Sequence, residues 1–446
     1  MSHPQDLGLR EQAALVASGE LDPAELLAET LARIDERDGE LNSVVARFPE
    51  ESERMLAEAP RGPLHGVPVG VKDMFQLPWR GPRDGSEREE LPPGESALFR
   101  ILRDAGAVVA GVTNMHYWGG GSTGAQSAYG PVGNPWDVKA CGGGSSGGSA
   151  AAVGARLVAG AVGTDGGGSI RLPGAYCGVT GLKLTYGAVP REGYTHGFAS
   201  MGAAGPLCRD AADARLLGGV LARRELAADD ARGAGIRAGL VRSPFWENLD
   251  PEVERACREL LDATGWQVEE IALEGAEHSV AATIMRLTLE GLPGLTREDL
   301  AAAPPLARAV AKYQMILPAR HLVQADRVRA LLRRELARAF ERCDVIVWPT
   351  VPAPAPAIEN PVYTLPEGEV RADPANVRQT GIGNLAGIPG ISVPAGLHSC
   401  GLPMALQLQA KWGDEATLCD AAEHIEKATD REFVDAVPPI ATATPA

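Results

Sequence analysis

Lysine is scarce in this 446-residue sequence, in which six lysines stand against 36 arginines. Positive charge is also in deficit, because 58 acidic side chains give a formal net charge of −16. Phosphate groups repel such an acidic chain, which argues against nonspecific binding to nucleic acid or to anionic membranes. Since lysine is not scattered over this sequence, a lysine inside an apolar segment is a candidate functional residue. The six are Lys72, Lys139, Lys183, Lys312, Lys411 and Lys427.

Paired cysteines and long apolar runs are also missing. The seven cysteines are odd in number and none has CxxC spacing, so we expect a reduced chain without a disulfide framework or a metal site. The N-terminus has neither the basic nor the apolar part of a signal peptide. No window of about 18 uninterrupted apolar residues predicts a membrane span. The sequence therefore predicts a cytoplasmic protein.

Helical and strand patterns alternate along the chain. Residues 6–60 favour helices, one of them starting at Asp22 as N-cap with Pro23 in the first turn. Alternating valines in 63–75 predict a strand that reaches Lys72, and 95–114 predict a helix, a turn and a buried strand. We therefore predict an α/β fold, with a mixed central sheet covered by helices on both faces.

No internal repeat or long linker divides the sequence, so we expect one large domain over 1–446. Within it we predict an N-terminal helical part (1–60), a glycine-rich core (61–210), a charged helical region (211–340) and C-terminal strands with a final helix (341–446).

Two glycine clusters lie in "CGGGSSGGSAAAVGARLVAGAVGTDGGGSIRLPGAYCG", from Cys141 to Gly178. The first spells a dinucleotide fingerprint, GxGxxG, but the polar segment before it is not the strand which that motif requires. It also spells the nucleophile elbow GxSxG, which needs an acid and a histidine downstream. A flexible linker would explain the first cluster but not the second. The downstream histidines, none in a distinctive context, are His278, His321, His398 and His424.

A fourth interpretation uses both clusters and Lys72. The stretch "GGSSGGSAAAVGARLVAGAVGTDGGGSIRLPGAYCGVTGLKLT" resembles the signature of the amidase signature family, and "GVPVGVKD" resembles its lysine strand. The segments "GVTNM", "CDVIVWPTVPAPAP", "NLAGIPGISVPAG" and "GLPMALQLQA" are similar to further parts of that family. The resemblance covers nearly the whole chain and is weakest from about 210 to 340. It implies the amidase signature fold, and hydrolysis of amide C–N bonds without a cofactor or metal.

The resemblance also implies roles for three residues. Ser169 corresponds to the nucleophile, Ser145 to a proton relay on a cis peptide, and Lys72 to the base. A serine hydroxyl is a weak nucleophile at neutral pH, so it needs such a base. Burial of Lys72 among apolar strand residues would lower its pKa from the usual ~10.4 and leave the amine neutral. The neighbouring Asp73 is expected on the opposite face of the strand.

The glycines fit the same chemistry. Four consecutive N–H groups, of Gly166, Gly167, Gly168 and Ser169, could receive the negative charge of a tetrahedral intermediate. Ser146, Asp165 and Arg171 match residues that surround the reacting groups in the family, and Asp165 could pair with Arg171 to hold the loop. The sequence departs from the signature at Gly166, at "GLKLT" and at Gly202, which leaves the substrate open.

For the substrate we expect a roomy, mostly uncharged pocket that takes small neutral amides with apolar or aromatic groups. Aryl esters and carbamates (urethanes) are plausible secondary substrates. One alternative is the transamidase (A-type) subunit of a tRNA-dependent amidotransferase; another is an inactive scaffold, which the complete lysine–serine–serine set disfavours. The resemblance allows a homodimer. The candidate substrate-binding residues are Trp118, Gly119, Gly120, Gly121, Tyr194 and Phe198.

Overall fold

The computed structural model describes residues 4–88, 90–194, 198–291 and 294–442. An eleven-stranded mixed sheet runs through it in the order β1-β3-β2-β4-β6-β5-β12-β13-β9-β7-β8. The pairs β2–β3, β2–β4, β7–β8 and β7–β9 are parallel and the others antiparallel. The strands are β1 (Val44–Ala46), β2 (Pro68–Lys72), β3 (Val108–Thr113), β4 (Gly160–Asp165), β5 (Thr180–Lys183), β6 (Ala203–Cys208), β7 (Arg237–Val241), β8 (Gln267–Ile271), β9 (Val345–Pro349), β12 (Gly390–Leu397) and β13 (Pro403–Ala410).

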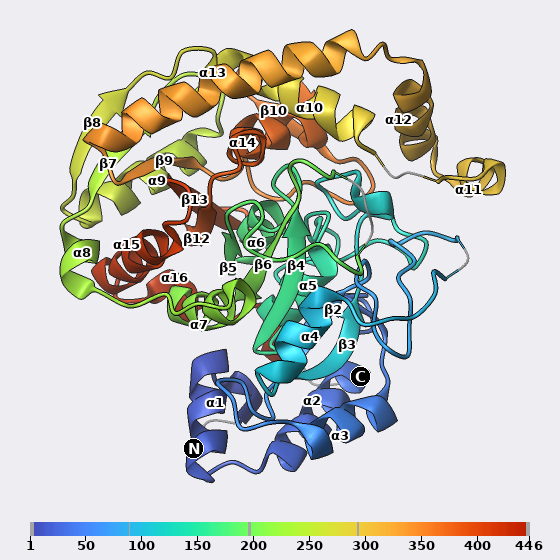
Figure 1. The fold of residues 1–446 in the computed structure, drawn as a ribbon. Helices are drawn as coiled ribbons and strands as arrows, with labels where there is room; N and C mark the ends of the chain where they lie inside the picture. Colours follow the sequence, from blue (N-terminus) through green and yellow to red (C-terminus); the bar gives the residue numbers. More distant parts are fainter. Residues whose placement is uncertain (1–3, 89, 195–197, 292–293, 443–446) are drawn as a thin grey trace.

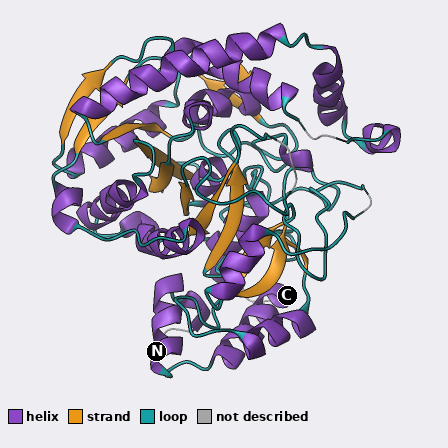
Figure 2. Cartoon of the chain, in the orientation of Figure 1, coloured by secondary structure: helices purple, strands orange, loops and turns teal. Residues whose placement is uncertain are grey.

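Helices surround this sheet, as Figures 1 and 2 show, and the predicted α/β class with a mixed sheet is confirmed. A separate hairpin is formed by β10 (Val362–Leu365) and β11 (Gly368–Arg371). The α-helices are α1 (Leu9–Ser18), α2 (Pro23–Arg37), α3 (Pro49–Glu58), α4 (Ala97–Asp104), α5 (Gly147–Gly154), α6 (Arg171–Cys177), α7 (Ala211–Ala222), α8 (Asp230–Ala234), α9 (Pro251–Ala263), α10 (Ser279–Leu289), α11 (Arg297–Ala302), α12 (Pro305–Ile316), α13 (Arg320–Arg342), α14 (Ala372–Ala386), α15 (Glu415–Ala428), α16 (Glu432–Asp435) and α17 (Pro439–Thr442).

Local sequence signals account for several of these elements. Asp22 caps α2 by accepting from the Ala24 N–H at 2.8 Å, and Pro23 takes the first helical position. The alternating valines form β2, all five residues of which are buried. The predicted turn before β3 falls at Gly106, whose φ of +84° suits glycine.

The charged region 211–340 is not purely helical, contrary to the sequence-based expectation. It contributes β7 and β8 to one end of the sheet. Four of the five residues of β8 are exposed, including Glu269 and Glu270. The strand therefore lacks the alternating apolar pattern that reveals a half-buried strand. The short β1 likewise interrupts the N-terminal part that we expected to be helical.

All seven cysteines are free thiols, and six of them are buried. Among the described helices, none is both long and apolar enough to pass through a membrane. Within the same residues, no group of three or more His, Cys, Asp or Glu side chains is arranged to hold a metal ion.

Candidate active site

Lys72 lies at the carboxyl end of β2 and is only 1% exposed. Its Nζ lies within hydrogen-bond distance of three hydroxyls, those of Ser145 at 2.7 Å, Thr164 at 2.9 Å and Ser146 at 3.0 Å. The ammonium can donate to all three, and the neutral amine can donate to two and accept from the third. Burial lowers the pKa of Lys72 to about 7, although Asp165 and Asp84 partly oppose that shift. A large fraction of the amine can therefore be neutral near pH 7, as a general base requires.

Asp73 faces away from Lys72, as the alternation of a strand predicts. Its carboxylate pairs with Arg80 at 2.5 Å and accepts a hydrogen bond from the Tyr129 hydroxyl at 3.1 Å. The nearest acid in sequence is thus already paired, and it does not form an ion pair with the Lys72 amine.

Ser145 and Ser146 belong to the loop that enters α5. The peptide bond between Gly144 and Ser145 is cis, and Ser145 is 2% exposed. The Ser146 hydroxyl donates to the carbonyl of Thr164 at 3.0 Å and accepts from the Thr164 N–H at 3.2 Å. Ser146 thereby ties its loop to β4, the strand that leads into the second glycine cluster.

The second glycine cluster forms a loop from β4 into α6. Its Ser169 is half-buried and lines a cavity, and its carbonyl accepts from the Ser146 N–H at 3.1 Å. The two serine loops are therefore joined directly through their backbones. No hydrogen bond joins the Ser145 and Ser169 hydroxyls, both of which belong to the described part of the chain, so proton transfer between them requires a closer approach.

Asp165 and Arg171 form the ion pair that the sequence suggested, with Arg171 Nε 3.1 Å from Asp165 Oδ2 and both side chains 0% exposed. Burial by itself would raise the pKa of Asp165, but Arg171, Lys183 and Asn384 lower it to about 2. Asp165 is therefore ionised at any working pH.

The four amides of the predicted oxyanion hole are not equivalent. The Gly168 N–H donates to Asp165 Oδ1 at 2.7 Å, so it is already engaged and does not face a substrate. Gly166, Gly167 and Ser169 line the cavity. Gly168 instead has φ of +128°, and an added Cβ would lie 2.2 Å from Thr380 Oγ1. It is a glycine for conformational and steric reasons.

The cavity beside Ser169 has a volume of about 240 Å³. Trp118, Gly119, Gly120, Gly121 and Phe198, all candidates from the sequence, line it. Gly119 and Gly120 leave room, since the nearest contact to an added Cβ would be 3.4 and 3.5 Å respectively. Gly121 does not, because His116 already occupies that space, 2.2 Å from where a Cβ would be.

Tyr194 is the one sequence-based candidate that does not line this cavity. It is 5% exposed and packs in the core, where its ring lies 5.1 Å from that of Phe75 and the Arg191 guanidinium lies 5.0 Å above it. The backbones of Tyr194 and Phe75 also form an isolated β-bridge. This aromatic ring therefore packs against the segment that follows β2 and does not face the cavity.

Sequence reasoning missed the far wall of the cavity, which three helices supply. Leu287 of α10, Val310 of α12 and Val377 of α14 line it, together with Asp373 at the start of α14. Asp373 accepts from the N–H and the hydroxyl of Ser122, both at 2.7 Å. The helical periodicity of these segments was readable, but no local pattern says that they face Ser169.

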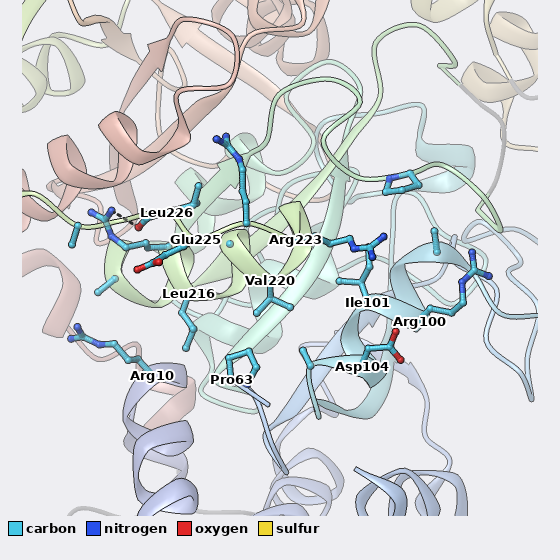
Figure 3. Close-up of a pocket in the computed structure, with 18 of the residues that line it drawn as sticks. Arg10, Pro63, Arg100, Ile101, Asp104, Leu216, Val220, Arg223, Glu225 and Leu226 are labelled. Carbon is cyan, nitrogen blue, oxygen red and sulfur yellow. Dashed lines mark hydrogen bonds between the residues drawn. The ribbon is translucent and has the colours of Figure 1, made fainter. Parts of the chain in front are cut away.

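The larger surface groove lies elsewhere. It has a volume of about 1080 Å³ and is lined by residues of α4 and α7. Figure 3 shows its lining, with Arg10 of α1 at one end. Three of its arginines are in ion pairs, Arg100 with Glu192, Arg215 with Glu423 and Arg224 with Glu415. None of its described lining residues is a predicted site residue. Size alone therefore does not identify the active site.

Comparison with known proteins identifies the family. Residues 25–419 match the family model for amidases. The chain belongs to the amidase signature family. It is 34% identical to the A-type subunit of the glutamyl-tRNA(Gln) amidotransferase from Myxococcus xanthus (strain DK1622), over 95% of this chain and 98% of that protein.

Two solved amidase signature structures have the same fold. One, described as an amidase, superposes with a TM-score of 0.89 at 30% identity, over 94% of this chain and 99% of the other. A 6-aminohexanoate cyclic dimer hydrolase in complex with substrate gives 0.85 at 26% identity, over 98% and 100%. The family is thereby fixed, whereas the names of these relatives point to different reactions.

Proposed function

We propose that this chain hydrolyses the C–N bond of small neutral amides through an acyl-enzyme on Ser169. The observation that carries the proposal is the hydrogen bond between the buried Lys72 amine and the Ser145 hydroxyl. Burial lowers the pKa of this amine to about 7, so a large fraction of it can be neutral near pH 7. That pair lies at the edge of a cavity that Ser169 lines: an added Cβ on Gly119, in the cavity wall, would lie 3.7 Å from Ser145 Oγ.

The proposed reaction begins when Ser169 Oγ forms a bond to the amide carbonyl carbon. Its proton passes to Ser145, which gives its own proton to the neutral amine of Lys72. The amides of Gly166, Gly167 and Ser169 are the candidates to stabilise the resulting oxyanion. When the C–N bond breaks, the proton returns through Ser145 to the leaving amine. A water molecule, deprotonated by the same relay, then attacks the acyl carbonyl carbon. The ester bond to Ser169 breaks, the acid leaves, and the relay returns the proton to Ser169 Oγ.

The cavity lining favours neutral substrates with apolar or aromatic groups. Trp118, Phe198, Leu287 and Val310 offer apolar surface, and each Å² of apolar substrate surface that they bury contributes roughly 25 cal/mol. The described lining residues include no lysine or arginine that could pair with a substrate carboxylate. An unpaired charge in such a site is penalised. Aryl esters and carbamates, which have better leaving groups than alkylamides, are proposed as secondary substrates.

A second candidate function is the A-type subunit of a tRNA-dependent amidotransferase. The name of the Myxococcus xanthus relative favours it directly, at 34% identity over nearly the full length of both chains. This function would require partner subunits, tRNA and a glutamine pocket. The hydrolase is placed first because the cavity lining is mostly apolar and its described residues include no lysine or arginine to bind the carboxylate of glutamine. A cytoplasmic location and a homodimer stay predictions.

The test is a substrate panel with the purified chain alone. We expect kcat/KM to be higher for an aromatic anilide than for glutamine, with an aryl carbamate in between. The same assays are repeated with Ser169→Ala, which controls for a contaminating amidase. If glutamine were the only substrate turned over, or if activity required added partner subunits and tRNA, the second candidate would replace this proposal.

A further inference from the structure

One peptide unit of the glycine loop is held at both of its ends. The Thr380 hydroxyl donates to the carbonyl of Gly167 at 2.5 Å, which is closer than the carbonyl of Asn376 in its own helix, at 3.0 Å. The Gly168 N–H donates to Asp165 Oδ1 at 2.7 Å. Thr380 lies on α14 and is 0% exposed. The Thr380 hydroxyl fits so closely that even one methyl group on Gly168 would overlap it. This peptide therefore has little freedom to rotate.

A second residue of α14 holds the start of the same loop. Asn384 Nδ2 donates to the carbonyl of Asp165 at 2.7 Å and to its Oδ1 at 2.8 Å. Its Oδ1 accepts from Arg171 at 2.7 Å, so the amide orientation is fixed from both sides. A trans peptide carries its C=O and N–H on opposite sides. Pinning the Asp165 carbonyl to Asn384 therefore turns the Gly166 N–H away from α14.

The same helix also forms part of the cavity wall. Asp373, Val377, Thr380 and Asn384 are spaced by four, three and four residues, which places them along one face of a helix. The first two line the cavity, and the last two hold the glycine loop. One buried helix thus sets both the substrate wall and the loop that carries Ser169.

We propose that Thr380 and Asn384 are positioning residues that orient the amides of the oxyanion loop. Neither side chain hydrogen-bonds to Ser145 or Lys72, and both act through the carbonyls of Gly167 and Asp165. This inference rests on the proposed hydrolase function. Because the oxyanion exists only after the attack, loss of either contact reduces kcat and leaves KM nearly unchanged.

The experiment compares Thr380→Val, which removes the hydroxyl, with Thr380→Ser, which keeps it. Thr350→Val is the matched control, because Thr350 is equally buried but bonds to the Ser392 hydroxyl at 2.9 Å. We expect kcat for an anilide to fall about 10- to 100-fold in Thr380→Val, as small misplacements in active sites do, and to recover in Thr380→Ser. Asn384→Leu is expected to act in the same direction.

Three further readouts separate positioning from general damage. A trifluoromethyl ketone, which forms a tetrahedral adduct on the serine, should bind more weakly to Thr380→Val, whereas KM and the pH profile should not change. If Thr380→Val does not fold, Thr380→Ala against Thr380→Ser isolates the hydroxyl. Unchanged kcat in a folded variant without the hydroxyl would overturn the inference. If Ser169→Ala also retained activity, the proposed function itself would fail.

Discussion

The pH dependence of turnover should report Lys72 directly. Burial lowers the pKa of this amine to about 7. At pH 6 about one lysine in eleven would be neutral, and at pH 8 about ten in eleven. If the neutral amine is the base, kcat/KM rises about tenfold per pH unit below 7 and levels off above pH 8. With an ordinary lysine the rise would continue to about pH 10.

Other titrating groups near the site do not give the same profile. Asp165 is ionised throughout, because its pKa is about 2. Burial lowers the pKa of His116, although Asp373 partly opposes that shift, so its titration moves to the acid side of its usual range. Lys183 is a confounding group, since burial lowers its pKa to about 7 as well. Lys183 donates to the carbonyls of Leu184 and Ile388 and not to either serine.

The assay is initial-rate anilide hydrolysis from pH 5 to 10 at constant ionic strength, for the wild type and for Lys183→Met. Both should give one ionisation near pH 7 in kcat/KM. A rate that climbs steadily past pH 9 would refute the buried-base argument. An ionisation that disappears in Lys183→Met would show that the wrong lysine had been assigned.

Three further predictions concern single substitutions. Ser169→Ala should lower kcat for amides by at least 1000-fold while the cavity still binds substrate; retention of a tenth of the wild-type rate would remove Ser169 as nucleophile. Gly168→Ala should cost about 1–3 kcal/mol of unfolding free energy and lower kcat, because its Cβ would meet Thr380 and Leu172 at 2.2 and 2.6 Å; urea melts that overlay those of the wild type would contradict this. The pKa of Lys183 is about 7 in the folded chain and ~10.4 in the unfolded chain. Between these two pH values the unfolded chain binds more protons. The free energy of unfolding therefore rises with pH, by up to about 1.4 kcal/mol per pH unit. Melts of Lys183→Met from pH 7 to 10 should lack that contribution, and an identical slope in both proteins would exclude it.

The sequence predicted those parts of the site that are local. Alternating valines predicted that Lys72 ends a buried strand, which the structure shows. The resemblance of the two glycine clusters to the family signature singled out Ser145, which lies beside Lys72, and Ser169. The ion pair between Asp165 and Arg171 was also accessible, because both residues lie within a few positions of each other.

The rest of the site depends on contacts between distant segments. Thr380 and Asn384 bond to a loop more than 200 residues earlier, and nothing in their own helix marks that partner. Tyr194 and Phe198 looked equivalent as aromatic residues of one loop, yet packing places one in the core and the other in the cavity. The exposed β8 was missed because an edge strand with two glutamates has no buried face to produce a pattern.

The hydrogen bonds of Arg171 have a consequence for synthesis of the chain. All three proposed reactive residues have been translated by residue 169, and Arg171 can pair early with Asp165. The other partners of its guanidinium, Thr380, Asn384 and Gln407, at 3.0, 2.7 and 2.9 Å, are translated more than 200 residues later. At 5–20 residues per second, the ribosome needs roughly 10–50 s to reach them. A nascent chain therefore carries the proposed nucleophile and base long before the glycine loop can acquire its final support. Catalysis should switch on only when nearly the whole protein has left the ribosome.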